Sequence, residues 1–424
     1  MTVRSSAPAR RRAPLVLALT ASLTAVLTAV LATGCGAGGE PGRTPEPSAS
    51  PPHGHVEGAR ESAEQQSRLV LSDSATGDTR VLDLITGKAH PVPAVAGVTA
   101  LTGDGRFGFL HSPGGVSVLD TGVWTVDHGD HVHYYRADIR AAGRTAARGE
   151  ARVRSDETLT AVTTAEGTAL HRRDGMEKGG IGAGRTLPGR YATVIPFREH
   201  LLAVPGPGGA AVSVLDREGR ERAALRTPCR DPRGDAVTRR GVVLGCADGA
   251  VLVQAGGDGN GNGNGFSAVA IPYPSDVPAS ERADGFRLRP GGDTLTALAG
   301  DDSVWVLNVT DRAWKRVETG PVLAAGTAGE GAPLLALGAD GALRAFDIES
   351  GERTAEAALK ALPVREGVRP GEAGAPDIAV DHSRAYVSDP AGRRIAEIDY
   401  NDSLRVARSF DLDIRPDLMV ETGR

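Results

Sequence analysis

The chain has few tryptophans, few cysteines and few segments that keep helical spacing, and these shortages exclude several classes of protein. Three tryptophans in 424 residues are too few to supply the repeated motifs of quinone-dependent propeller dehydrogenases. The His-Glu-x-x-His pattern of zinc proteases is missing. The stretch "GGIGAGR", residues 179–185, is not followed by the Gly-Lys-Ser/Thr of a phosphate loop. The sequence therefore offers no familiar catalytic motif.

An excess of basic charge is also lacking. The whole chain has a net charge of -5, and residues 1–34 carry four arginines and no acidic residue, so the rest of the chain is near -9. Because nucleic-acid-binding domains present a basic patch or stripe, nucleic acid is not expected as a partner.

Residues 1–34 are typical of an export signal. A basic front with Arg4 precedes an apolar run over residues 15–32, and small residues lead to Cys35. This order resembles a bacterial lipoprotein signal that is cut before the cysteine, although Ala32 stands where leucine is usual. The alternatives are an ordinary signal peptide or a single membrane anchor. We expect lipidation at Cys35 and a location on the extracytoplasmic face of the cell membrane.

The segment 35–66 is rich in Gly, Pro, Ser and Glu and cannot bury a core. It is predicted to be a disordered tether between the membrane and a folded body that covers residues 67–424.

The body is a succession of similar hairpins, which predicts an all-β fold. "RLVLSDSATGDTRVLDLITGK" shows the unit: a strand, a polar turn and a second strand, often closed by Asp. Eight such units, spaced by roughly 30 to 60 residues, favour a β-propeller of four-stranded antiparallel blades. Eight blades are expected, or seven if the units near residues 156 and 190 share a blade. The first unit lacks a strand, and "PDLMVETGR" at the end of the chain can supply it and close the ring.

Two cysteines remain once Cys35 is set aside. An even count in an exported chain predicts a disulfide between Cys229 and Cys246, and two buried thiols are the alternative.

Three of the ten histidines lie in "TVDHGDHVHYY", residues 125–135. His131 and His133 are two residues apart, which places both side chains on one face of an extended strand. His128 lies across Gly129, where the chain can turn sharply. If all three imidazoles bind one Zn²⁺ ion, the fourth position of a tetrahedral site is left for a carboxylate or a water molecule. Histidines that only bond between strands are the alternative interpretation.

Several residues are candidates for supporting roles in this site. Asp127 and Asp130 could ligate the metal or orient a ligating imidazole, and His111 in the preceding hairpin could take the fourth position. The spacing does not choose among them. His53 and His55 form a second, looser pair in the tether, suited to a weak relay of zinc or to a plain polar linker.

The stretches "HVEGARESAEQQSRLVLSDSATGDTRVLDL", "GVWTVDHGDHVHYYR" and "GCADG" resemble the AztD-type zinc metallochaperones, which are exported propellers. The resemblance implies that His128, His131 and His133 bind zinc, that the tether histidines help to deliver it, and that the partner is the solute-binding protein of a zinc ABC importer. One departure is "CRDPRGDA", where Arg233, Gly234 and Asp235 stand in place of a His-Gly-Glu in the family pattern.

The function expected from the sequence is therefore zinc binding and transfer by a monomer, and not catalysis. A zinc-dependent propeller hydrolase or lyase is the alternative, because three histidines also leave an open position for water.

Overall fold

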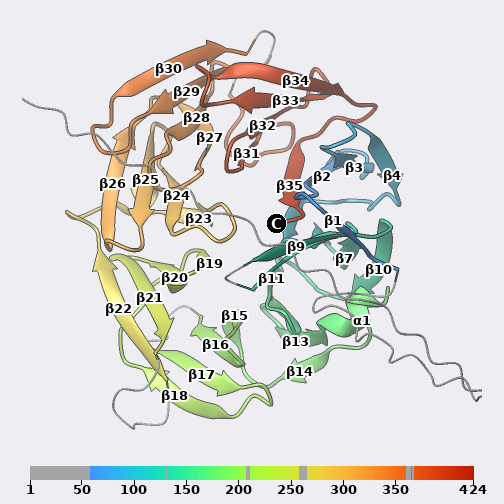
Figure 1. Ribbon diagram of the computed structural model, residues 1–424. Coiled ribbons are helices and arrows are strands. Elements are labelled where there is room, and N and C mark those ends of the chain that lie inside the picture. Colours follow the sequence, from blue (N-terminus) through green and yellow to red (C-terminus); the bar gives the residue numbers. More distant parts are fainter. Residues whose placement is uncertain (1–57, 129–130, 207–210, 257–264, 360–363, 365–366) are drawn as a thin grey trace, which may run out of the picture. The chain divides into compact units, whose positions relative to one another are not determined.

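The hairpins of the sequence assemble into a ring of sheets in the computed structural model, which describes residues 58–128, 131–206, 211–256, 265–359, 364 and 367–424 (Figure 1). In that part of the chain, eight sheets have four antiparallel strands each and a ninth has three. The prediction of eight blades is confirmed, because the units near residues 156 and 190 form separate sheets. Cys35, His53, His55 and Asp130 lie outside the described residues.

The first four blades are built from the N-terminal half of the ring together with the last strand of the chain. In sheet order, their strands are β35 (Leu418–Thr422), β2 (Arg68–Ser72), β3 (Thr79–Asp83) and β4 (Ala89–Val92); β10 (Arg140–Thr145), β7 (Gly115–Asp120), β6 (Phe107–Ser112) and β5 (Ala100–Gly103); β11 (Arg152–Ser155), β12 (Leu159–Thr164), β13 (Gly167–Arg172) and β14 (Arg185–Leu187); β15 (Tyr191–Phe197), β16 (His200–Pro205), β17 (Val212–Asp216) and β18 (Glu221–Leu225).

The remaining four blades follow the chain without interruption. Their strands are β19 (Asp235–Thr238), β20 (Gly241–Cys246), β21 (Gly249–Ala255) and β22 (Phe266–Pro272); β23 (Asp284–Arg287), β24 (Thr294–Ala299), β25 (Ser303–Asn308) and β26 (Ala313–Glu318); β27 (Val322–Thr327), β28 (Leu334–Gly338), β29 (Ala342–Phe346) and β30 (Arg353–Ala358); β31 (Ile378–Val380), β32 (Ala385–Asp389), β33 (Arg394–Asp399) and β34 (Arg405–Asp411). Two short helices, α1 (Arg173–Glu177) and the 3₁₀ helix η1 (Ala279–Glu281), lie in connections between strands.

The ring closes where the sequence predicted. Strand β35 at the end of the chain pairs with β2 at the start of the body, with Val70 opposite Val420. This pairing completes the first blade, which would otherwise have only three strands. The two ends of the folded body are thereby held in one sheet.

The core lies between neighbouring blades, because each blade is covered on both faces. Strands β2, β6, β20, β28 and β32 are buried along their whole length, which explains their nearly continuous apolar sequences. Cys229 and Cys246 form the predicted disulfide, which lies in the core between the fourth and fifth blades. Among the described residues, no helix is long and apolar enough to cross a bilayer.

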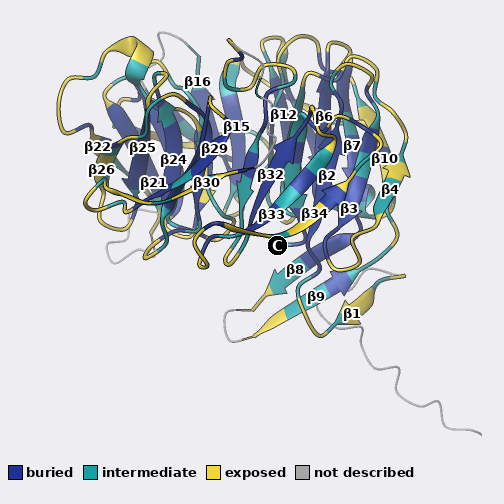
Figure 2. Ribbon diagram, turned by 90° about the horizontal axis from the view of Figure 1, so that it is seen from above, coloured by how far each residue is buried: buried dark blue, intermediate teal, exposed yellow. Residues whose placement is uncertain are grey.

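A small third layer departs from the propeller pattern. Strands β8 (Val123–Asp127) and β9 (Val132–Arg136) form a hairpin between β7 and β10, and β1 (Arg60–Ser62) pairs with β9 to complete a three-stranded sheet. This sheet projects from one face of the ring (Figure 2). Part of the predicted disordered tether, residues 60–62, is therefore a strand. This strand forms because the edge of β9 offers its backbone groups for pairing.

Candidate metal centre

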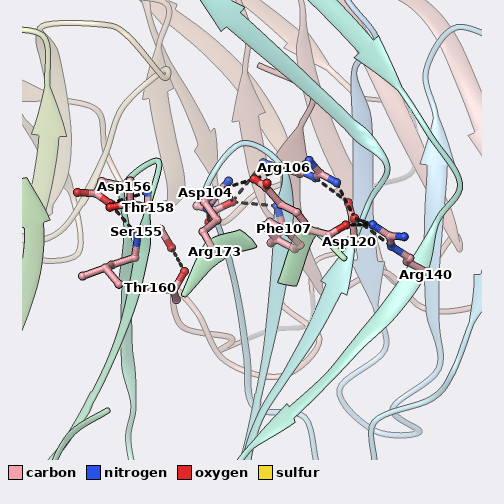
Figure 3. Close-up of polar contacts among 12 residues, drawn as sticks. Asp104, Arg106, Phe107, Asp120, Arg140, Ser155, Asp156, Thr158, Thr160 and Arg173 are labelled. Atoms are coloured by element: carbon pink, nitrogen blue, oxygen red, sulfur yellow. Dashed lines mark hydrogen bonds and ion pairs between the residues drawn. The ribbon is translucent and has the colours of Figure 1, made fainter. Parts of the chain in front are cut away.

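The projecting hairpin begins and ends at a buried ion-pair network in the second blade (Figure 3). Asp120, at the end of β7, accepts hydrogen bonds from Arg106 Nε at 3.1 Å and Nη2 at 2.9 Å. Asp120 also accepts a 3.1 Å hydrogen bond from Nη2 of Arg140, which is the first residue of β10. Because Asp120 precedes the hairpin and Arg140 follows it, this carboxylate ties the two ends of the insertion together.

Gly122 provides the turn by which the chain leaves the blade. Its φ is +70°, and a Cβ at this position would lie 2.4 Å from the carbonyl oxygen of Ala137. The amide of Ala137 donates a 2.6 Å hydrogen bond to the carbonyl oxygen of Gly122. Only glycine allows this close approach of the two chain segments at the root.

Aromatic side chains form a firm base above the root. Trp124 on β8 and Tyr135 on β9 are buried and stack with ring centroids 5.3 Å apart. The guanidinium of Arg106 lies 3.9 Å from the Trp124 ring centroid, a cation–π contact. The base of the hairpin is thus continuous with the packed blade beneath it.

Three imidazoles gather at the tip of the same hairpin. His128 follows β8, His131 precedes β9 and His133 lies within β9. Their ring centroids are 4.8 to 5.2 Å apart, and one nitrogen of each lies within 4.8 Å of the others. The amide of His128 donates a 3.0 Å hydrogen bond to the carbonyl oxygen of His131, which holds the two ends of the turn together. The predicted convergence of the three side chains is present.

This group has the donors that zinc prefers. Three imidazole nitrogens bind Zn²⁺ well, and hard cations such as Mg²⁺ or Ca²⁺ poorly. His128 and His131 are exposed and His133 is half-buried, so the group is open to solvent and to another molecule. Among the described residues, it is the one group of three or more potential ligands that gathers in this way.

One contact to the group was not foreseen. Glu61 on β1 accepts a 2.6 Å hydrogen bond from Nδ1 of His133. The sequence placed this glutamate in the disordered tether, and no spacing pattern links it to a histidine 72 residues later. Only the pairing of β1 with β9 brings the two together.

Two further candidate ligands, Asp127 and His111, lie within the described residues. Asp127 is exposed at the end of β8, next to His128, and the structure does not add it to the group. His111 is not part of the group either. It is buried in β6, where its Nε2 lies 2.9 Å from the hydroxyl of Thr102. Burial, reinforced by the charge of Arg154, lowers the pKa of His111 to about 4. The structure thus places His111 on β6 inside the blade, apart from the group of three imidazoles on the insertion.

The segment around Arg233, Gly234 and Asp235, which departs from the pattern of the AztD-type proteins, forms ion pairs. Asp235 has a fully buried side chain that pairs with Arg154, and Arg233 pairs with Asp231 at 3.0 Å. A cavity of about 550 Å³ lies beside Arg154, His111 and Gly234. An arginine–carboxylate pair occupies this region, and within the described residues no second group of ligands gathers there.

Comparison with known proteins addresses the fold. No protein-family model and no curated protein sequence matches the chain. Among solved structures, AztD from Citrobacter koseri aligns with a TM-score of 0.70 at 17% identity, over 85% of this chain and 98% of that one. The chain has the fold of AztD. The apo form of C. koseri AztD aligns with a TM-score of 0.69 at 16% identity, over 84% and 98% of the two chains.

The resemblance to AztD that the residues suggested is thus confirmed for the fold. A weaker likeness, with a TM-score of 0.52 and 15% identity over 84% of this chain and 75% of the other, links it to the dihydro-heme d1 dehydrogenase NirN in complex with DHE. Since the propeller fold is shared by AztD and a dehydrogenase, the fold does not select the function. The roles of individual residues follow from the geometry of this chain.

Proposed function

We propose that this protein is an extracytoplasmic zinc-binding metallochaperone that delivers Zn²⁺ to the solute-binding protein of a zinc ABC importer. The observation that carries the proposal is the convergence of His128, His131 and His133 within 4.8 Å on a hairpin that projects from the ring. Likeness of fold to AztD supports it.

The position of the imidazoles suits transfer more than storage. Ligands on a projecting hairpin can be reached by the ligands of a second protein, so zinc can pass by ligand exchange. The fourth position is left to water, to Asp127 or Asp130, or to an incoming ligand of the partner. A buried, four-ligand site would hold zinc for structure and would resist exchange.

The location of the protein is part of the same proposal. Lipidation of Cys35 would anchor a monomer at the outer face of the cell membrane, and the tether would let the ring reach an importer component. The disulfide is consistent with an oxidising compartment. His53 and His55, outside the described residues, would collect or pass on zinc as weak ligands.

A zinc-dependent hydrolase or lyase is the alternative function. Three histidines with an open fourth position can also activate water. The two functions differ in what they require beyond the metal: an enzyme needs a bound substrate and proton transfer, whereas a chaperone needs an acceptor protein.

Metal titration of the unit Pro52–Arg424, which contains all eight blades, tests the proposal. We expect tight binding of zinc, and its loss when His131 and His133 are both replaced by alanine. His382→Ala removes an exposed histidine on the eighth blade and serves as the matched control. Circular dichroism of all three proteins should be the same.

Transfer is measured with the purified apo solute-binding protein of a zinc importer. Zinc should reach that protein faster than it reaches a chelator that captures only dissociated zinc. Equal rates would contradict direct delivery, and stoichiometric zinc in the double variant would contradict the assignment of the site.

A further inference from the structure

The hydrogen bond between Glu61 and His133 points to a role for the strand that precedes the propeller. The inference rests on the proposed zinc site and adds a residue that controls how one ligand meets the metal. Glu61 lies on β1, whose three residues pair with β9 alone.

The register of the small sheet explains the contact. Glu61 is opposite Tyr135, and His133 is two residues from Tyr135 on the same strand. Side chains two apart on a strand share a face, so Glu61, Tyr135 and His133 lie on one side of the sheet. On the other neighbouring strand, Val126 lies opposite His133, and the side chain of a valine cannot form a hydrogen bond. Glu61 is therefore the neighbour across the strands that can orient this imidazole.

The direction of the hydrogen bond decides the protonation pattern of the ring. An ionised carboxylate only accepts hydrogen bonds, so Nδ1 of His133 carries the hydrogen and donates it to Oε1 of Glu61. In a neutral imidazole the other nitrogen, Nε2, then keeps its lone pair. A metal-ligating histidine commonly donates its second ring N–H to a carboxylate, which fixes its tautomer and orientation.

We infer that Glu61 is a positioning residue that holds His133 in the tautomer that binds zinc through Nε2. The imidazole of His133 thereby has the tautomer and orientation needed for zinc binding already in the metal-free protein. Because the carboxylate stands on β1, the pairing of β1 with β9 is needed for full affinity. Residues 60–62 are thus part of the zinc site, and a protein truncated at residue 66 would bind zinc more weakly than one truncated at residue 57.

The affinity test compares substitutions of Glu61 in the full chain. Glu61→Ala should weaken zinc binding by about 10- to 100-fold, the usual loss when the partner of a ligating histidine is removed. The zinc affinity of Glu61→Gln should lie between those of Glu61→Ala and the unchanged protein. The amide oxygen of the glutamine still accepts a hydrogen bond from Nδ1 of His133, but it carries no charge. Glu64→Gln makes the same charge change on an exposed glutamate two residues beyond β1 and should leave affinity unchanged.

A spectroscopic test does not depend on zinc. Imidazole ¹⁵N resonances of the metal-free protein at pH 8 should show His133 with its hydrogen on Nδ1, and Glu61→Ala should shift the ring towards the other tautomer. An Nε2–H tautomer in the unchanged protein overturns the inference, as does equal zinc affinity of Glu61→Ala.

X-ray absorption of the zinc-bound protein separates positioning from direct ligation. We expect the same first shell around zinc in the unchanged protein and in Glu61→Ala. Loss of an oxygen from that shell would make Glu61 a ligand and overturn the inference. If the unchanged protein fails to bind zinc, the proposed function fails, and the tautomer measurement still decides the role of Glu61.

Discussion

Replacing His111 by glutamine tests whether this histidine serves the blade or the metal. Its ring is buried in β6 and bonded to the hydroxyl of Thr102. Burial lowers the pKa of His111 from 6.5 to about 4 in the folded protein, and the nearby charge of Arg154 adds to the effect. Glutamine can keep a hydrogen bond to Thr102 and does not titrate.

The sign of the pH effect follows from which state binds the proton. Between pH 6.5 and about 4, the unfolded chain is protonated at His111 and the folded protein is not, so the free energy of unfolding falls as the pH drops. Below about pH 4 both states are protonated and the loss is complete. The full loss amounts to about 3 kcal/mol, of which about 2 kcal/mol has occurred at pH 5.

Urea unfolding at pH 7.5 and at pH 5, followed by tryptophan fluorescence, measures this difference. The unchanged protein should lose about 2 kcal/mol more between the two pH values than His111→Gln. Zinc stoichiometry should be the same in both proteins. Equal pH dependence would refute the assigned burial effect, and a variant that binds less zinc would restore His111 as a ligand.

Three further predictions concern the metal, the hairpin root and the disulfide. Zinc affinity should fall as the pH is lowered, because a protonated imidazole has no lone pair for the metal; competition with a chelator that does not titrate in the same range measures this, and a flat profile would argue against imidazole ligands. Asp120→Ala should lower the free energy of unfolding by about 3 to 5 kcal/mol, because it removes the carboxylate that accepts both hydrogen bonds of the buried Arg106; a loss below about 0.5 kcal/mol in urea would contradict this. Replacing Cys229 and Cys246 by serine should cost about 3 kcal/mol of stability without changing zinc stoichiometry, and loss of zinc would connect the disulfide to the site.

The ring of blades was predictable because its pattern is repeated. Each hairpin unit shows the same pattern of apolar strand, polar turn and apolar strand. A unit whose own pattern is ambiguous can therefore be assigned by comparison with the other units. The closing strand was predictable for a related reason, since a first blade with three strands requires a fourth, and β35 supplies it. The disulfide followed from the count of cysteines.

The small sheet was harder to predict because its contacts are not repeated. Strand β1 consists of "RES", which has no apolar alternation and lies in a polar stretch. Strand β1 forms because the edge of β9 is available for pairing, and no pattern in residues 60–62 predicts this. The place of His111 could not be predicted for a related reason: closeness in sequence to the histidine cluster says nothing about position in space once the chain leaves the blade at Gly122.

The geometry of the tip would allow a rigid fold to bind zinc and release it again, as the proposed function requires. Tetrahedral bonds of about 2.0 to 2.1 Å place neighbouring nitrogens about 3.3 Å apart. The three imidazoles, whose nitrogens lie within 4.8 Å of one another, need to approach by no more than about 1.5 Å. His128 and His131 are exposed and can make this movement by rotating, while Asp120 and the Trp124–Tyr135 stack keep the root fixed. In the proposed transfer, the same freedom would let a partner's ligands displace the imidazoles one at a time, and the blades would not need to move when zinc leaves.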